Sequence, residues 1–121
     1  MLPQVMIVGP TGSGKSELAL DLAQSLGAEL ASMDAFQIYR GMDIGTGKVP
    51  EGERRGLRHH LMDLVECTET FSVGDYLERA AGVLSGMTRP LVWVGGTGLY
   101  YRSLRQGLSD IPARIARWWK F

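Results

Sequence analysis

The chain has 121 residues, a length that suits one small domain. Hydrophobic residues make up 45% of it, and 13 basic residues balance 13 acidic ones to give a formal net charge of zero. This composition is typical of a globular protein and excludes a disordered or strongly basic chain. By itself it gives no reason to propose a nucleic-acid partner, because such partners usually require a clustered basic surface.

Cysteine usage and the start of the chain bear on location. Cys67 is the only cysteine, which excludes an intrachain disulfide and a cysteine-rich metal site. A reducing environment fits a single thiol, so we expect a cytoplasmic protein. The apolar run over residues 5–8 is far too short for a signal peptide or a membrane span, and we expect no membrane association.

The first half of the chain predicts two strands and a helix. Residues 5–8 form a short apolar run typical of a buried strand. Leucines at four-residue spacing predict a helix over residues 18–26, which Gly27 is placed to end. A second short strand is predicted over residues 29–33. The segment 34–58 is rich in turns and lacks periodicity, and loops of this length in small domains are usually functional or mobile.

The second half continues the alternation of strands and helices. Residues 60–65 predict a short strand. A helix begins at Ser72, because Asp75 three positions later can complete a capping box. Residues 91–94 form another continuous apolar strand, and a helix follows over residues 99–104.

Strand and helix therefore alternate three times, which is typical of an α/β fold with a parallel sheet covered by helices. Right-handed crossovers would bring the loops at residues 9–16, 34–40 and 95–98 to the carboxyl edge of that sheet. Ligands bind at this edge in open α/β sheets, so we expect the three loops to converge on one site.

A phosphate-binding loop lies between the first strand and the first helix. The sequence there matches the pattern G-x-x-x-x-G-K-[ST] at every fixed position. Glycines let several N–H groups point at one anion, and the helix N-terminus adds its positive dipole end. The lysine supplies a mobile charge, and the final serine hydroxyl is placed to bind Mg²⁺. The predicted phosphate-binding residues are Gly9, Pro10, Thr11, Gly12, Ser13, Gly14, Lys15 and Ser16.

A P-loop indicates a bound di- or triphosphate but not the reaction. Hydrolases of ATP and GTP usually end a buried strand with an acid that helps to hold Mg²⁺, whereas the strand over 91–94 ends in Gly95 and Gly96. The best-placed carboxylate is that of Asp34, after the second strand. Asp34 is either a general base facing the phosphate site or a cap of the following turn.

At this point the sequence resembles the tRNA dimethylallyltransferases, also called tRNA isopentenyltransferases or the IPP transferase family. The resemblance rests on blocks that occur in the family's order and extend over residues 5–108, a far more specific signal than a P-loop alone. It implies a P-loop NTPase-like three-layer fold with a parallel sheet, of which this chain would be the N-terminal, incomplete part. The matching blocks are residues 9–16, 32–48, 59–63, 71–76 and 94–100.

The resemblance also implies an activity: transfer of a dimethylallyl group from dimethylallyl diphosphate to the exocyclic N6 of adenosine 37, beside the anticodon of tRNA. The implied partners are therefore dimethylallyl diphosphate and the tRNA anticodon stem-loop, with Mg²⁺ as cofactor and a monomeric full-length enzyme. The P-loop would hold the diphosphate, stabilising the charge that grows on the leaving group. The implied catalytic residues are Asp34, as the base, and Thr11; the implied tRNA contacts are Asp34, Ala35, Phe36, Gln37 and Thr97; and Ser16 would bind the metal.

Several features set this chain apart from the family. Family members are considerably longer, and residues 113–121 form a tail unlike theirs, so we assign residues 1–112 to a truncated P-loop prenyltransferase core. The RNA-binding surface would lie mostly in the missing part, which would explain the neutral charge. We expect little or no prenyltransferase activity from the 121-residue chain alone.

Other functions stay open. An adenylate isopentenyltransferase would prenylate free adenine nucleotides, although the block over 43–48 is more similar to the tRNA-modifying branch. A small P-loop nucleotide kinase would bind ATP instead, and a non-catalytic remnant would only bind phosphate. The basic cluster over residues 54–60 either meets RNA phosphates or forms a solvated loop with structural histidines. Asp43 and Lys48 receive no role from spacing alone.

Overall fold

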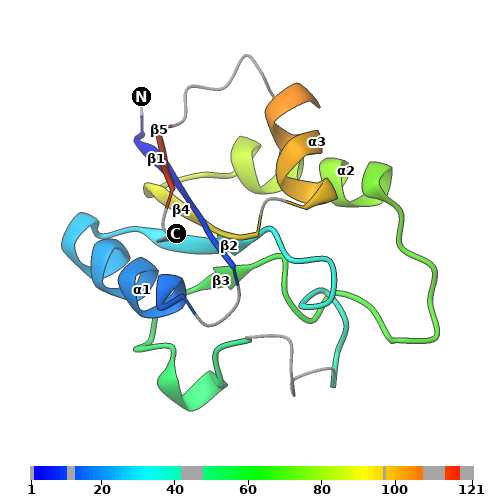
Figure 1. The fold of residues 1–121 in the computed structure, drawn as a ribbon, viewed down its shortest axis with the longest axis horizontal. Coiled ribbons are helices and arrows are strands. Elements are labelled where there is room, and N and C mark those ends of the chain that lie inside the picture. The colour runs from blue at the N-terminus through cyan, green and yellow to red at the C-terminus, as the bar shows by residue number, and fades with distance from the viewer. Residues whose placement is uncertain (1, 11–12, 42–47, 97, 108–113, 118–121) are drawn as a thin grey trace.

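A computed structural model of the chain describes residues 2–10, 13–41, 48–96, 98–107 and 114–117. Within these residues it has an α/β fold (Figure 1), as predicted. No helix of the described part is long and apolar enough to cross a membrane. The strands are β1 (Gln4–Val8), β2 (Glu29–Ser32), β3 (His59–His60), β4 (Leu91–Gly95) and β5 (Arg114–Arg117), and the helices are α1 (Lys15–Leu26), α2 (Val73–Ser85) and α3 (Leu99–Gly107), with a 3₁₀ turn at Glu51–Glu53.

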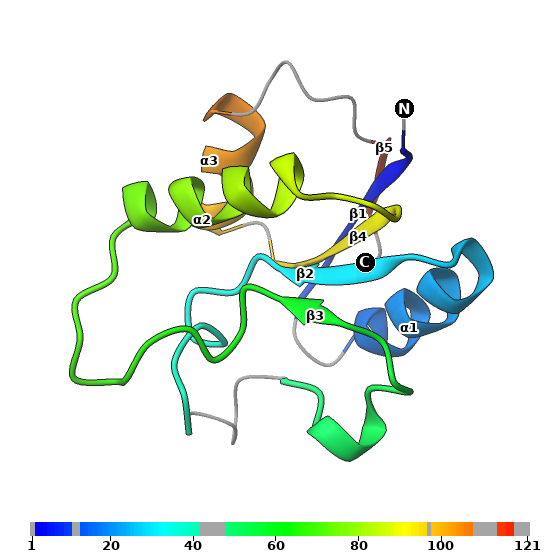
Figure 2. The same cartoon turned by 180° about the vertical axis from the view of Figure 1, so that it is seen from behind.

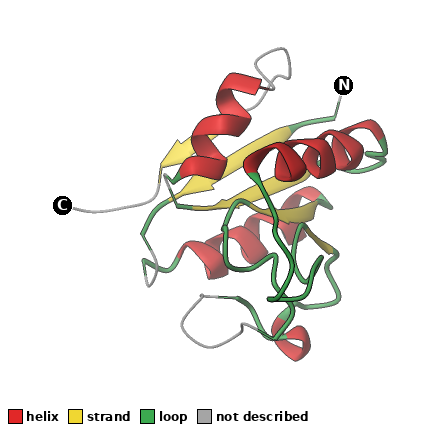
Figure 3. Cartoon of the chain, turned by 90° about the vertical axis from the view of Figure 1, so that its right-hand side faces the viewer, coloured by secondary structure: helices red, strands yellow, loops and turns green. Residues whose placement is uncertain are grey.

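The strands form one sheet in the order β3-β2-β4-β1-β5, and every neighbouring pair is parallel. Helices α2 and α3 lie on one face of the sheet and α1 lies on the other (Figure 2). A view from the side shows the strands between the two helical layers (Figure 3). These are the three layers expected of a P-loop fold.

Alternate residues of each strand serve the two faces, because successive side chains of a strand point in opposite directions. In β1, Met6 and Val8 pack with α2 and α3, whereas Ile7 packs with α1. In β4, Trp93 belongs to the core on the side of α2 and α3, and Val92 to the core on the side of α1. The continuous apolar runs of the sequence are thus explained, since both faces of the sheet are covered.

Local signals set the helix ends as predicted. Gly27 ends α1 in the left-handed conformation, with φ of 65°. Ser72 caps α2 by accepting a hydrogen bond from the Asp75 N–H, while the Asp75 carboxylate accepts one from the Ser72 N–H, which completes the capping box.

Two parts of the fold differ from the sequence-based expectation. The strand predicted over residues 60–65 is wrong in extent, because β3 ends at His60. Leu61 and Asp63 both have positive φ, which an extended strand cannot accommodate, and Val65 makes only an isolated bridge with Tyr39. Strand β5 was not predicted at all; it pairs with β1 at the edge of the sheet.

Candidate functional site

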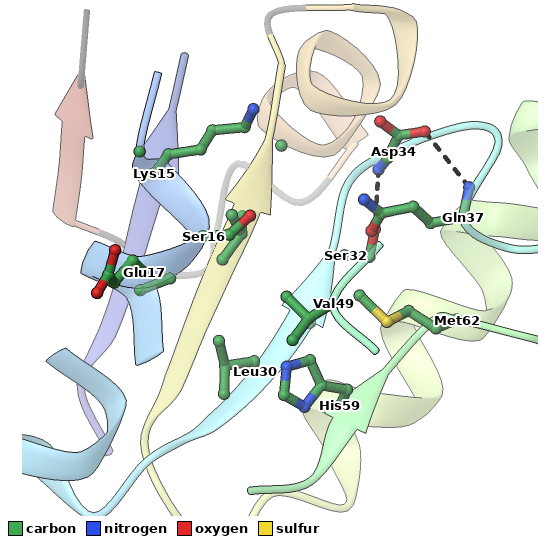
Figure 4. Close-up of a pocket in the computed structure, with 15 residues that line it drawn as sticks. Lys15, Ser16, Glu17, Leu30, Ser32, Asp34, Gln37, Val49, His59 and Met62 are labelled. Carbon is green, nitrogen blue, oxygen red and sulfur yellow. Dashed lines mark hydrogen bonds between the residues drawn. The ribbon is translucent and has the colours of Figure 1, made fainter. Parts of the chain in front are cut away.

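The loops at the carboxyl edge of the sheet converge on one cavity of about 290 Å³ (Figure 4). Its lining comes from the start of α1, the end of β2 and the loop after it, the end of β4, and the segment around β3. The predicted convergence is therefore confirmed for the described residues. Predicted positions that line the cavity are Gly14, Lys15, Ser16, Asp34, Gln37 and Gly95.

The loop predicted to bind phosphate ends in a left-handed Gly14, with φ of 84°, at the N-cap of α1. No side chain caps α1, so the N–H groups of its first turn can bind an anion. The Lys15 Nζ folds back and donates a hydrogen bond to the Pro10 carbonyl oxygen at 3.0 Å. The lysine charge therefore lies over the loop that it would serve in phosphate binding.

Lys15 and Asp34 reach toward one another from α1 and from the loop after β2 (Figure 4). Burial lowers the pKa of the Lys15 ammonium below its ordinary value, and attraction to the Asp34 carboxylate opposes that shift. An anion bound between α1 and Lys15 would bring its own negative charge to the ammonium and help to keep it protonated.

Asp34 caps the turn after β2 and also lines the cavity. Its Oδ1 accepts hydrogen bonds from the N–H groups of Phe36 at 2.8 Å and Gln37 at 3.3 Å, so it caps the turn that follows β2. The same side chain lines the cavity. Its own N–H donates to the Ser32 Oγ, which in turn donates to the Gln37 Oε1 at 2.8 Å. The turn thus holds Asp34 and Gln37 together at the cavity wall.

A buried tyrosine of α2 is hydrogen-bonded to the backbone at the end of β2, where this turn begins. The Tyr76 hydroxyl donates a hydrogen bond to the Ser32 carbonyl oxygen at 2.5 Å, and its ring stacks on that of Tyr100 with centroids 4.1 Å apart. Strand β3 pairs with β2 only at Leu30 and Ala31, so Ser32 lies beyond that pairing. Tyr76 therefore supplies the hydrogen bond that the short strand cannot.

The end of the cavity away from Lys15 is apolar. Leu30, Val49 and Met62 gather there, with the ring of His59 beside them (Figure 4). These residues were not predicted as site residues. His59 and Met62 lie in the block over residues 59–63, but spacing alone gives them no place in the site. Parallel pairing of β3 with β2 brings His59 next to Leu30 from a distant part of the chain, and Val49 and Met62 join them at the cavity.

The His59 ring in this wall is hydrogen-bonded to the backbone through one nitrogen. Its Nδ1 lies 2.9 Å from the Leu57 carbonyl oxygen. Burial lowers the pKa of the His59 imidazole, the hydrogen bond to Leu57 opposes this, and the nearby charges of Arg54 and His60 lower it further. A neutral ring is therefore favoured at pH 7, with Nδ1–H as the donor to the carbonyl.

The basic cluster is largely engaged within the protein. Arg54 Nε donates to the Val49 carbonyl oxygen, Arg55 pairs with Asp21 at 2.6 Å, and His60 contacts Glu29 at 2.7 Å. This agrees with a loop that contains structural histidines more than with a free phosphate-binding patch.

The remaining predicted positions divide into two groups. Gly9, Pro10 and Ser13 of the P-loop sequence, and Ala35 and Phe36, are described by the structure but do not line the cavity; Phe36 is 59% exposed. Thr11, Gly12, Asp43 and Thr97 lie outside the described residues.

Comparison with known proteins gives the family context. A model of the family described as IPP transferase matches residues 37–119. This match extends past residue 112, the end that the sequence analysis assigned to the prenyltransferase core. The chain is 46% identical to the tRNA dimethylallyltransferase of Solibacter usitatus over 116 residues, covering 93% of this chain and 38% of that protein. It is 48% identical to the enzyme of that name from Mycobacteroides abscessus, covering 98% and 40%. The chain thus spans well under half the length of these relatives.

Solved structures agree. The tRNA isopentenylpyrophosphate transferase of Bacillus halodurans superposes with a TM-score of 0.80 at 41% identity, covering 88% of this chain and 36% of that one. A eukaryotic dimethylallyltransferase that acts on tRNA superposes with a TM-score of 0.79 at 31% identity, covering 86% and 27%. With a shared sheet, shared helices and a family match over more than half of its residues, this chain belongs to the IPP transferase family.

Proposed function

We propose that this chain carries the donor-binding part of a tRNA dimethylallyltransferase, which transfers a dimethylallyl group from dimethylallyl diphosphate to N6 of adenosine 37 in tRNA. One observation carries the proposal: a single cavity has a phosphate-binding loop at one end and apolar side chains at the other, with a carboxylate opposite the loop. A diphosphate bearing a short hydrocarbon chain is complementary to such a cavity.

The phosphate end would bind the leaving group. The N-terminal N–H groups of α1 and the Lys15 ammonium would receive the diphosphate oxygens, and stabilise the negative charge that grows there as the carbon–oxygen bond breaks. Leu30, Val49 and Met62 provide the apolar surface for the five-carbon chain. Thr11 belongs to this loop in sequence, and we assign it to the diphosphate.

A hard oxygen site suits Mg²⁺. The described residues hold no group of three or more His, Cys, Asp and Glu side chains able to enclose a metal, so the ion would be shared between the Ser16 hydroxyl at the cavity wall and the phosphate oxygens. When bound, it would neutralise part of the diphosphate charge. This donor set fits magnesium, which commonly retains water and binds through substrate phosphates.

Asp34 would act as the base. In the transfer, the N6 nitrogen of adenine forms a bond to C1 of the dimethylallyl group while the bond from C1 to the diphosphate oxygen breaks. The proton released from N6 passes to the Asp34 carboxylate, which helps most once bond formation has made the N–H acidic. Gln37, which is hydrogen-bonded to Ser32 beside Asp34, would orient the adenine. We also assign Ala35, Phe36 and Thr97 to contacts with the nucleoside.

The acceptor would be the anticodon stem-loop of a tRNA in the cytoplasm. The similar proteins are named as enzymes that act on tRNA, which favours this acceptor over the free adenine nucleotides of adenylate isopentenyltransferases. The adenine would have to leave its stack to reach Asp34. We propose that the full-length enzyme is a monomer that grips tRNA with parts absent from this chain.

Isothermal titration tests the donor site directly. Dimethylallyl diphosphate and ATP, each with Mg²⁺, are titrated into the purified chain after circular dichroism has shown that it is folded. We expect the prenyl diphosphate to bind more tightly than ATP. Preference for ATP would favour a nucleotide kinase, and a folded chain that binds neither ligand would refute the proposed donor site. In a full-length protein, product formation from a stem-loop against AMP, ADP or ATP then separates the tRNA enzyme from the adenylate enzyme.

A further inference from the structure

Lys48 is the only charged residue that is buried among those the structure describes, with its side chain 3% exposed. Its Nζ donates hydrogen bonds to the Asp63 Oδ1 at 2.6 Å and to the Tyr39 carbonyl oxygen at 2.9 Å. Burying an ammonium group is costly unless it is paired and hydrogen-bonded. Lys48, Asp63 and the Tyr39 carbonyl therefore form a cluster around a buried ammonium group, with the Asp63 side chain 38% exposed; we call it the Lys48 clamp.

The clamp fixes a strained loop. Leu61 and Asp63 are two of the three non-glycine residues with positive φ in the described structure, at 65° and 54°. Such conformations cost energy and persist only where the surroundings hold them. Here the Asp63 carboxylate is held by Lys48 and, at 3.7 Å, by Arg54, while the carbonyl oxygens of Gln37 and Ile38 accept hydrogen bonds from the backbone N–H groups of residues 63, 64 and 65.

Three residues that line the cavity are connected to the Lys48 clamp and to the loop it holds. Met62 lies between the two strained residues, Val49 directly follows Lys48, and the Gln37 carbonyl accepts the Asp63 N–H at 3.0 Å. All three side chains line the cavity, whereas Lys48 and Asp63 do not. The clamp thus supports lining residues of the cavity without itself lining it.

We propose that Lys48 and Asp63 are positioning residues that shape the apolar end of the site for the hydrocarbon part of the donor. This inference rests on the proposed function, in that it takes a prenyl diphosphate as the ligand. The phosphate end is built from α1 and its preceding loop, whereas the contacts of the clamp described above are with Tyr39 and with the loop over residues 61–65. Loss of the clamp should therefore weaken binding of the prenyl group and leave binding of the diphosphate group intact.

The test compares two ligands that share the diphosphate: dimethylallyl diphosphate and inorganic pyrophosphate, each titrated with Mg²⁺. In Lys48→Met the alkyl stem is kept and the ammonium is lost. We expect the affinity for dimethylallyl diphosphate to fall about tenfold, as for the loss of contact with roughly two methylene-sized groups, while pyrophosphate affinity changes less than about twofold. Asp63→Ala should also weaken dimethylallyl diphosphate binding and leave pyrophosphate binding nearly unchanged. If Lys48→Met fails to fold, Asp63→Ala serves as the test.

Conservative and control variants sharpen the result. Asp63→Asn keeps an oxygen acceptor and a residue that tolerates positive φ, so it should recover most of the selectivity lost in Asp63→Ala. Glu66→Gln removes the exposed Arg40–Glu66 pair, at 3.0 Å, which links the same two segments at the surface; it should leave both affinities unchanged.

Each outcome decides the inference. Equal weakening of both ligands in Lys48→Met and Asp63→Ala would show that the clamp only supports the fold, and no change in either ligand would show that it positions nothing; both results overturn the inference while leaving the proposed function in place. Preference of the wild-type chain for ATP, or failure of the folded chain to bind either diphosphate, would overturn the proposed function itself and this inference with it.

Discussion

The hydrogen bond from Tyr76 to the Ser32 carbonyl offers a sharp test of how the turn after β2 is held. Tyr76→Phe removes only the hydroxyl, because the phenylalanine ring can keep the stack on Tyr100 and the packing of a side chain that is 0% exposed. The Ser32 carbonyl then loses its partner in the protein interior. Leaving a buried acceptor unsatisfied costs about 1–3 kcal/mol, so the free energy of unfolding should fall by that amount.

Urea unfolding followed by far-UV circular dichroism measures this change. We expect a lower urea midpoint. The slope of the free energy of unfolding against urea concentration should not change, since the surface exposed on unfolding stays the same. Dimethylallyl diphosphate affinity should fall as well, because Ser32 Oγ holds both Asp34 and Gln37 at the cavity wall. A loss of stability below about 0.5 kcal/mol, the range of neutral surface substitutions, would refute the claim that Tyr76 satisfies this carbonyl.

The same tyrosine makes a prediction about pH. Burial raises the pKa of the Tyr76 hydroxyl well above its ordinary value of 10.0, and the neighbouring Tyr100 raises it further. Below pH 10 the hydroxyl is protonated in both states. Above it, the unfolded chain loses the proton and the folded one does not, so stability falls with rising pH by up to about 1.4 kcal/mol per pH unit. Tyr76→Phe should show a shallower alkaline decline than wild type, and parallel curves for the two proteins would contradict this.

Three further substitutions probe the sheet, a helix cap and the proposed phosphate site. In Gly95→Ala the new Cβ would lie 2.8 Å from the Met33 Cβ, so overpacking should cost about 1–3 kcal/mol in urea unfolding; unchanged stability would mean that β2 and β4 can separate at no cost. Ser72→Ala removes the side-chain acceptor of the α2 capping box and should cost about 1 kcal/mol. A urea midpoint equal to wild type would show that the cap is dispensable. Lys15→Met should weaken pyrophosphate binding about tenfold or more with little effect on stability, and retention of full affinity would remove Lys15 from the phosphate site.

Much of this protein follows from short-range sequence signals. The P-loop pattern, the terminating Gly27, the capping box at Ser72 and the apolar runs of the strands each depend on residues within a few positions of one another. Backbone conformation and capping act over that same range, so these elements were predictable. The convergence of three loops at one edge of the sheet followed as well, because parallel pairing places the carboxyl ends of the strands together.

The tertiary structure alone decided the rest. The early end of β3, the pairing of β5 with β1, the apolar wall at Val49 and Met62, and the partnership of Lys48 with Asp63 involve segments brought together only when the chain folds. A buried ammonium, a residue of positive φ and a pocket wall leave no periodic trace in the sequence. Their free energy depends on which groups surround them in space, and hydrophobic burial, which drives that assembly, has no direction of its own.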